Sequence, residues 1–285
     1  MNSVELRHLQ ALIAVAEEGT FTDAAIRLGV SQPAVSRLIA GLEELCGARL
    51  VERTTRSVAL TERGALAYRG AAVAVSAVND VIEIARGQSR PLRLGFAWSA
   101  LGSLTTQVLQ RWRTENPEVP LEVHRFDERA AGLLRAAVDI AVIRGKIDEP
   151  RLVAHQILSE PRVAALPLGH RLASRRTVDL LELVEDTVLT TATGTTTVDL
   201  WPEDQQPRST LRVDNVDEWL TEIAGGLAVG VTTESTTTQH AHPGIRFVPL
   251  TGASTVPVYL AWSSTRHHPA TERFVSLVER IVAGH

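Results

Sequence analysis

The feature that most constrains this chain is a pair of helical segments around a glycine turn, in the run TFTDAAIRLGVSQPAVSRLIAGLEEL that begins at Thr20. Thr20 and Asp23 resemble a capping box, because the hydroxyl accepts an unpaired backbone N–H while the carboxylate reaches back. Gly29 provides the left-handed backbone conformation that often ends a helix. Ser31 and Pro33 are typical of the first turn of a second helix. The spacing therefore predicts two short helices joined by a tight turn.

The second predicted helix has an apolar side and a polar side. Apolar residues recur at spacings of three and four, at Val35, Leu38, Leu42 and Leu45. The same periodicity turns five residues at the start of this helix outward, namely Ser31, Gln32, Pro33, Ser36 and Arg37. A helix in this position of a helix-turn-helix lies in the major groove of DNA, where Gln and Arg suit adenine and guanine. A small helical core with a solvated polar side fits the same spacing, so the flanking sequence decides between the two interpretations.

Both flanks favour DNA binding. Upstream, an amphipathic helix is predicted from the apolar residues Leu6, Leu9, Ile13 and Ala16. Downstream, residues 50–53 and 57–60 have the pattern of a short hairpin with Arg53 and Arg56 at its tip. Two guanidinium groups on such a wing are suited to binding phosphate oxygens, which position a protein on the duplex without reading its sequence.

Taken together, residues 5–64 resemble the N-terminal domain of the LysR-type transcriptional regulators. The resemblance rests on the LRHL opening, the AEEGTFTDAA run, SQPAVSR, the LEE that follows, and LVER with LTERG in the wing. It implies a winged helix-turn-helix domain over residues 1–60 that binds double-stranded DNA. By this resemblance, base-reading and backbone-contacting roles fall on Ser31, Gln32, Pro33, Ser36, Arg37, Arg53 and Arg56. Cys46 departs from the family pattern, beyond the base-reading half of the helix.

The charge of this region is not uniformly basic. Residues 1–65 contain seven arginines and eight acidic residues, which gives a net charge of −1. Phosphate binding must therefore depend on where Arg37, Arg53 and Arg56 are placed, with the acidic groups turned away. We still expect the affinity for DNA to fall as salt rises.

Composition is that of a soluble globular protein with room for more than one domain. The chain has 285 residues, of which 44% are hydrophobic and 22% charged. Its single cysteine excludes an internal disulfide framework. The sequence begins with an amphipathic helix pattern rather than a signal peptide, and no uncharged apolar run is long enough to span a bilayer. We therefore expect a cytoplasmic protein without a membrane segment.

A long helix is predicted for residues 61–86, which contain neither proline nor a cluster of turn residues. Its apolar residues follow a heptad-like seam at Tyr68, Ala71, Val75, Val78, Ile82 and Ala85. The LysR family uses this linker helix for dimerisation, so we expect a homodimer or homotetramer and an operator that is an interrupted dyad. Residues 87–91 are expected to be a hinge, and the linker region is assigned to residues 61–90.

Beyond the hinge, strand-like and helix-like runs alternate in LRLGFAW, LGSLTTQVLQRW, LEVHRF, ERAAGLLRAAV and DIAVIRG. This alternation predicts a parallel α/β sheet. A second unit of the same kind begins near Pro161. Its strands are expected at 162–166, 187–190 and 228–232, and its helices at 178–184 and 216–224. The strand 256–262 and the helix 269–282 are expected to return to the first unit.

This C-terminal region resembles the effector domain of the same family, although more loosely, in RVAALPLGHRLA, IAGGLAVGVTT and YLAW with PATERFVSLV. The resemblance implies an α/β fold like that of periplasmic binding proteins over residues 91–285. Subdomain I is assigned to 91–160 and 263–285, and subdomain II to 161–262. The whole chain is thus expected to be an α+β multidomain protein. Thr233 and Ala228 depart from the family pattern at one wall of the ligand cleft.

Ligands of open α/β sheets bind beyond the carboxyl ends of the strands. This rule selects the residues Trp98, Ser99, Arg144, Thr190, Thr191, Thr193 and Thr232 as candidates for effector binding. Arg144 at a strand end requires a carboxylate partner, from a ligand or from the protein. Each candidate also has a structural interpretation, such as a capping serine, a core tryptophan or a polar loop. The set suits a small carboxylate effector.

No pattern in the chain indicates catalysis or a bound metal. His240, His242, His267 and His268 lack cysteines or carboxylates at ligand spacing, so we expect no metal site. GxSxG, HExxH and GxGxxG motifs are missing, and TTATGTTT lacks the lysine of a phosphate-binding loop. We expect a sequence-specific transcriptional regulator that is not an enzyme and has no cofactor besides its effector. Two alternatives stay open: a DNA-binding module fused to an enzyme, and a cytosolic ligand-binding dimer without a regulatory role.

Overall fold

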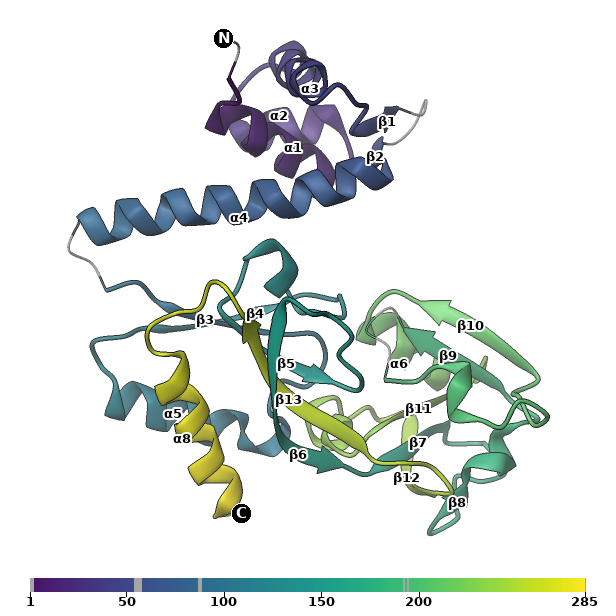
Figure 1. The fold of residues 1–285 in the computed structure, drawn as a ribbon. Helices are drawn as coiled ribbons and strands as arrows, with labels where there is room; N and C mark the ends of the chain where they lie inside the picture. The colour runs from purple at the N-terminus through teal and green to yellow at the C-terminus, as the bar shows by residue number, and fades with distance from the viewer. Residues whose placement is uncertain (1–2, 54–57, 87–88, 192, 194, 285) are drawn as a thin grey trace. The chain divides into compact units, whose positions relative to one another are not determined.

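The computed structural model describes residues 3–53, 58–86, 89–191, 193 and 195–284. The chain divides into two compact units (Figure 1). The first unit contains Met1–Arg90 and Leu134–Ala137, and the second contains Pro91–Leu133 and Val138–His285.

The first unit contains the predicted helices and the short hairpin. Its elements are α1 (Leu6–Glu18), α2 (Phe21–Leu28), α3 (Gln32–Cys46), β1 (Val51–Arg53), β2 (Val58–Leu60) and α4 (Glu62–Ala85). The start of α2 is capped as predicted, because Thr20 Oγ1 accepts the N–H of Asp23 at 3.0 Å. Gly29 ends α2 with φ of +65°. Ser31 is the N-cap residue of α3, but its side chain makes no capping hydrogen bond, contrary to prediction.

The core of this unit lies among α1, α2, α3 and the start of α4. Val35, Ile39 and Leu42 of α3 are buried in it. Ile39 therefore occupies the centre of the stripe, and Leu38, which the spacing selected, is only partly buried. The polar start of α3 faces away from this core.

Helix α4 enters this core through a close contact with the wing. Gly64 lies so near the Leu50 carbonyl oxygen that a Cβ at position 64 would be 1.9 Å from it. Ala71 is buried against the same core, whereas Val78 and Ile82, further along the helix, are exposed. By length and composition alone α4 could also cross a membrane, which for a single helix is weak evidence.

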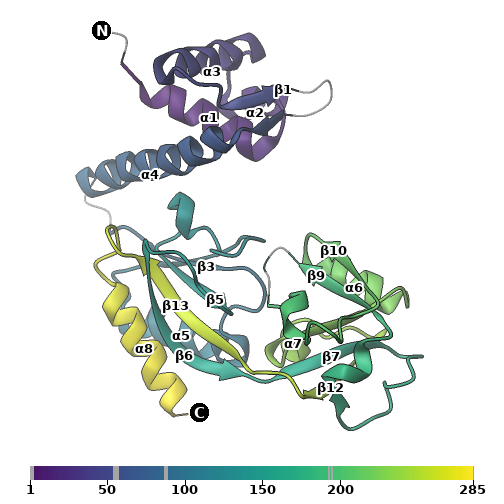
Figure 2. The same ribbon diagram turned by 45° about the vertical axis from the view of Figure 1, so that its right-hand side comes forward.

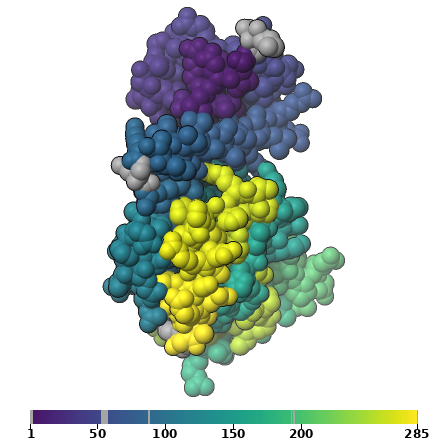
Figure 3. Space-filling model, turned by 60° about the vertical axis from the view of Figure 1, so that its left-hand side comes forward, coloured from purple at the N-terminus to yellow at the C-terminus, as the bar shows by residue number. Residues whose placement is uncertain are grey.

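The second unit contains two mixed sheets, one in each subdomain (Figure 2). The five-stranded sheet has the order β4-β3-β5-β13-β6, with β3 parallel to β4 and β5, and β13 antiparallel to its neighbours. Its elements are β3 (Leu92–Phe96), η1 (Gly102–Leu104), α5 (Thr105–Glu115), β4 (Leu121–Arg125), η2 (Leu133–Arg135), β5 (Ile140–Arg144), β6 (Leu152–Glu160), β13 (Val256–Ser263) and α8 (Thr271–Ala283). Helices α5 and α8 pack together in the core of this sheet, and α8 is the yellow helix facing the viewer in Figure 3.

The six-stranded sheet has the order β10-β9-β11-β7-β12-β8. Its elements are β7 (Arg162–Pro167), β8 (Val178–Asp179), η3 (Leu180–Leu183), β9 (Thr187–Thr191), η4 (Val198–Leu200), β10 (Ser209–Val213), α6 (Val216–Ala224), β11 (Val229–Thr233), α7 (Ser235–Gln239) and β12 (Ile245–Thr251). Two separate cores form here, one of them around α6. A Cβ on Gly230 would lie 2.0 Å from the ring of Trp219, so this glycine lets α6 pack closely on β11.

The chain crosses between the two subdomains at Pro161 and again between β12 and β13. Arg162 follows the first crossing and joins it to the second, because its Nε donates to the Ser254 carbonyl at 2.9 Å. Its Nη1 donates to the Thr195 carbonyl at 2.7 Å. Burial lowers the pKa of Arg162. The two crossings and the loop that contains Thr195 are thus held together by one side chain.

Several predictions for the second unit are wrong. Residues 128–138 form turns and the short η2 instead of an α-helix, because Ala131, Gly132 and Ala136 have positive φ. Residues 178–184 form β8 and a 3-10 helix that begins at an Asp179 N-cap. The sheets are mixed rather than parallel. The strand expected at 256–262 returns to subdomain I as predicted, because β13 pairs with β5 and β6, so subdomain I begins again at Val256 and not at the assigned residue 263.

We expect Gly64→Ala to destabilise the first unit by about 1–3 kcal/mol, because the added methyl group overlaps a backbone carbonyl and must displace α4. Gly70→Ala in the same helix is the control, since nothing lies within 4 Å of its Cβ position. That change should be stabilising by about 0.5–1 kcal/mol. Urea unfolding followed by circular dichroism measures both. Equal effects of the two substitutions would contradict the close contact.

Candidate nucleic-acid interface and ligand cleft

The start of α3 presents polar groups on the surface of the first unit. Ser31, Gln32, Pro33 and Arg37 are exposed, and Ser36 is half-buried. Their side chains surround the first N–H groups of a helix, which a phosphate oxygen or a base edge can accept. This surface matches the five residues that the sequence selected.

Arginines of the first unit differ in how far their charge is neutralised. Arg27 forms ion pairs with Glu17 at 2.6 Å and Glu18 at 3.1 Å. Burial raises the pKa of Glu17, but hydrogen bonds from Tyr68 and Arg27 outweigh it, so this pKa lies below its ordinary value. Arg37 has no ion pair among the described residues. The charge of Arg37 is therefore not neutralised within the described part of the chain, although the unit carries many acidic groups.

The wing is tied directly to the recognition helix. Glu43 of α3 accepts the backbone N–H of Leu50 at 2.8 Å and that of Val51 at 3.1 Å. Arg53 is the last residue of β1, opposite Val58. Arg56 lies outside the described residues. The acidic Glu43 thus serves to fix β1 relative to α3, which keeps the start of the wing at a set position beside the helix.

In the second unit, a hollow forms at the carboxyl ends of strands from both sheets. It is small, since the centre of a water molecule fits within a volume of only about 20 Å³. Its lining residues are Ala97, Trp98, Arg129, Val142, Ile143, Arg144, Thr193, Thr195, Thr232 and Thr233. Four of the candidates from the sequence, Trp98, Arg144, Thr193 and Thr232, therefore lie together here.

Trp98 connects the two walls of this cleft. Its Nε1 donates to Thr236 Oγ1 at 3.0 Å, and Thr236 is 2.7 Å from the hydroxyl of Thr232. Its ring meets that of Trp219 edge-on, with centroids 5.5 Å apart. His240 Nε2 lies 3.1 Å from the Trp98 carbonyl oxygen. A residue that follows β3 is thus fixed to α6 and α7 of the other subdomain.

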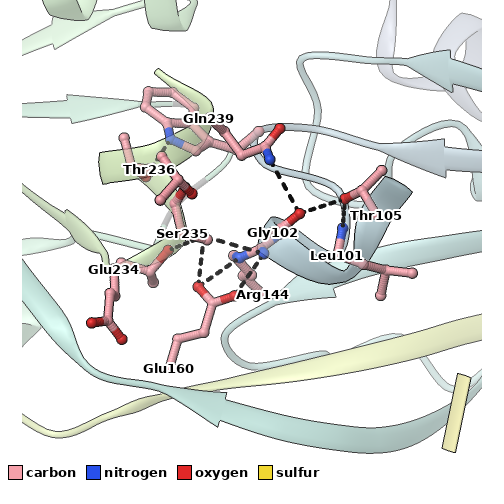
Figure 4. Close-up of polar contacts among 12 residues, drawn as sticks. Leu101, Gly102, Thr105, Arg144, Glu160, Glu234, Ser235, Thr236 and Gln239 are labelled. Atoms are coloured by element: carbon pink, nitrogen blue, oxygen red, sulfur yellow. Dashed lines mark hydrogen bonds and ion pairs between the residues drawn. The ribbon is translucent and has the colours of Figure 1, made fainter. Parts of the chain in front are cut away.

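Arg144 meets a carboxylate of the protein itself (Figure 4). Its Nη2 lies 2.8 Å from Glu160 Oε1, and its Nε lies 3.2 Å from Oε2. Ser235 donates its hydroxyl to Glu160 at 2.8 Å. Burial raises the pKa of Glu160, but the hydrogen bond and charge of Arg144 outweigh it, so this pKa lies below its ordinary value. Of the two partners that the sequence left open, Arg144 thus has the protein carboxylate.

The remaining candidates, Thr190, Thr191 and Ser99, do not line this hollow. Thr191 lines an adjoining hollow with Trp98 and Thr232, and its hydroxyl is 2.9 Å from that of Thr193. Thr190 lines neither hollow. Ser99 is only 2% exposed, and its Oγ has no hydrogen-bond partner in the described part of the chain.

Sequence reasoning missed several lining residues. Arg129, Thr195 and Thr233 lie beside the predicted ones. The strand-end rule could have found Arg129, because it follows the carboxyl end of β4, which is parallel to β3. A larger hollow, with a comparable volume of about 500 Å³, lies near η1 and α7 and contains Glu160 and Glu234. No predicted residue lines it.

Among the described residues no group of three or more His, Cys, Asp or Glu side chains is placed to hold a metal ion. His242 and His268 instead accept backbone N–H groups of Gly244 and Ala270.

Two family models match the chain. The model described as a bacterial regulatory helix-turn-helix protein of the lysR family matches residues 6–65, and the LysR substrate binding domain matches residues 85–282.

Curated relatives agree with both matches. The chain is 34% identical to the transcriptional regulator ShiR of Corynebacterium glutamicum, over 82% of this chain and 84% of that one. It is 27% identical to HcaR, the Hca operon transcriptional activator of Escherichia coli, over 98% and 99% of the two chains.

Solved structures have the same fold. CbnR, a LysR family regulator, superposes with a TM-score of 0.66 at 24% identity, covering 97% of this chain and 98% of that chain. A second structure of full-length CbnR, bound to its target DNA, covers 98% and 99% at 25% identity with a TM-score of 0.56. The chain therefore belongs to the LysR family of transcriptional regulators, with a helix-turn-helix domain followed by a substrate-binding domain.

Proposed function

We propose that this regulator binds, as a homodimer or homotetramer, an operator with interrupted dyad symmetry, and that a small anionic molecule in the cleft modulates this binding. The observation that supports DNA reading most directly is the exposed, polar start of α3, where Arg37 has no ion pair with any residue that the structure describes. The related CbnR has been solved with its target DNA. We place base contacts on Gln32, Ser36 and Arg37. Backbone contacts are assigned to Ser31, Pro33, Arg53 and Arg56.

The proposal of a dimer rests on the apolar stripe of α4. At about 100° per residue, Ala71, Val78 and Ile82 lie on the same side of the helix. Ala71 is buried in the core of the first unit, but Val78 is 38% and Ile82 43% exposed. The stripe thus continues along α4 past the core of the first unit. A second copy of α4 would cover this exposed part. A two-fold dimer then presents two copies of α3 to successive major grooves.

The effector proposal rests on the polar groups of the cleft. Ser99 is not among the residues that line the hollow, but its buried hydroxyl has no partner in the described part of the chain and would pair with a ligand oxygen brought within reach. Trp98, Thr193, Thr232 and Arg144 line the space, Thr191 lines the adjoining hollow, and Thr190 precedes Thr191 in β9. A ligand that contacts both subdomains changes their equilibrium only through its different affinity for the two arrangements. We assign no catalytic residue, and we place this DNA-binding protein in the cytoplasm.

Arg37→Ala should weaken operator binding by about 1–3 kcal/mol and relax sequence preference, because Arg37 lies on the exposed side of α3. Arg53→Ala should weaken binding to all duplexes alike. Arg113→Ala, which removes one exposed positive charge from α5 in the second unit, is the charge control. The operator is obtained by sequencing the DNA fragments that the protein retains. Unchanged selectivity in Arg37→Ala would refute its base-reading role.

Val78→Glu should dissociate the dimer, because a buried carboxylate without a partner is costly. Val73→Glu is a closely matched control, because Val73 is 40% exposed in the same helix and lies about 140° around it. Light scattering measures the mass of each variant. A monomer with Val73→Glu and an intact dimer with Val78→Glu would place the interface on the other side of α4.

Ser99→Ala should leave the ligand-free protein as stable as before, or more so, because it removes a buried hydroxyl without a partner. The same change should reduce the thermal stabilisation given by a binding metabolite. A screen of metabolites by thermal unfolding tests this, with Ser103→Ala on the exposed part of η1 as control. An effector that is neutral or cationic would refute the anion proposal and leave the DNA-binding role intact.

A further inference from the structure

The cleft contains two arginines, of which only one is neutralised by the protein. Arg144 forms its ion pair with Glu160. Arg129 is exposed at the cleft and has no ion pair or hydrogen bond with any described residue. The residues that line this hollow include no Asp or Glu. The lining therefore contributes one uncompensated positive charge, and that charge belongs to Arg129.

The loop that carries Arg129 is held in place by its backbone. Glu128 accepts the N–H of Gly132 through Oε1 at 2.8 Å. On the other side, the Ala131 carbonyl oxygen would be 2.2 Å from a Cβ on Gly95, so this loop lies directly against β3. Ala131 is fully buried. The backbone at Arg129 is thus fixed beside the cleft, while its guanidinium is free to bind.

The other residues that line the cleft indicate which chemical groups a ligand bound to Arg129 would carry. Val142, Ile143 and the ring of Trp98 provide apolar surface. The hydroxyl of Thr193 pairs with that of Thr191 at 2.9 Å, and Thr233 with Ser235 at 3.0 Å. One cation, threonine hydroxyls and an apolar wall fit a small molecule with a single negative charge and an apolar body.

We propose that Arg129, and not Arg144, supplies the counter-charge for a monoanionic effector, a small carboxylic acid with an apolar body. The inference rests on the proposed role of the cleft as the effector site. Arg144 is then a positioning residue, because it holds Glu160 and, through it, Ser235 of α7. The effector carboxylate would be bound at the end of β4 rather than at the end of β5.

The test compares acids with their neutral amides on the full-length protein. Benzoate and benzamide, and acetate and acetamide, are the probes, and calorimetric titration measures their affinities. We expect the wild type to prefer each acid to its amide. Arg129→Gln should weaken benzoate binding roughly ten- to a hundredfold, as expected for loss of a charge-assisted hydrogen bond, and leave benzamide unchanged. Arg129→Lys should keep part of the preference.

Arg125→Gln is the charge-matched control, because Arg125 lies in β4 and is paired with Asp127 at 3.0 Å. It should keep the full preference for the acids. Wild-type protein without any preference for either acid would overturn the proposal, and so would an unchanged preference in Arg129→Gln. Selective retention of operator DNA by the same preparation tests the regulator function separately, so failure of the two ideas can be told apart.

Discussion

The ion pair between Arg144 and Glu160 is the interaction on which the second unit depends most. Arg144 ends β5 in one subdomain, Glu160 ends β6 at the crossing, and Ser235 of the other subdomain donates to the same carboxylate. Both charged residues are only 9% exposed. Removing one partner of such a buried pair costs about 3–5 kcal/mol, because the other charge stays buried. The pair therefore fixes the base of the cleft and decides which positive charge is left for a ligand.

Local signals in the sequence predicted local structure well. The cap at Thr20, the turn at Gly29 and the helix 216–224 were found because each depends on neighbouring residues. The helix expected at 128–138 was wrong, although its composition favours a helix, because Ala131 and Ala136 have positive φ and the Ala131 carbonyl lies directly against Gly95 of β3. Tertiary contact overrides propensity at such positions. The strand 256–262 was expected to return to the first unit, and its pairing with β5 and β6 agrees with this, so only the assigned subdomain boundary at residue 263 was wrong.

The candidate site residues also fall into those that local sequence selects and those that depend on tertiary contacts. The exposed residues of α3 follow from helical periodicity, so the sequence alone selects them. Arg144 and Arg129 look equivalent in sequence, as arginines after strands of one sheet. Their difference arises from Glu160, sixteen residues from Arg144, which only the fold brings to it. The strand-end rule can select both arginines, but only the tertiary structure shows which of them the protein neutralises.

The double crossing between the subdomains has a mechanical consequence. A domain joined by one linker can rotate freely, but two neighbouring strands restrict the subdomains to bending about a single axis through both. Arg162 joins these strands to the loop of Thr195. Bending at the crossing must therefore carry one wall of the cleft with it. Bending about the two crossings would therefore couple a movement of the cleft wall to a rotation of one whole subdomain relative to the other.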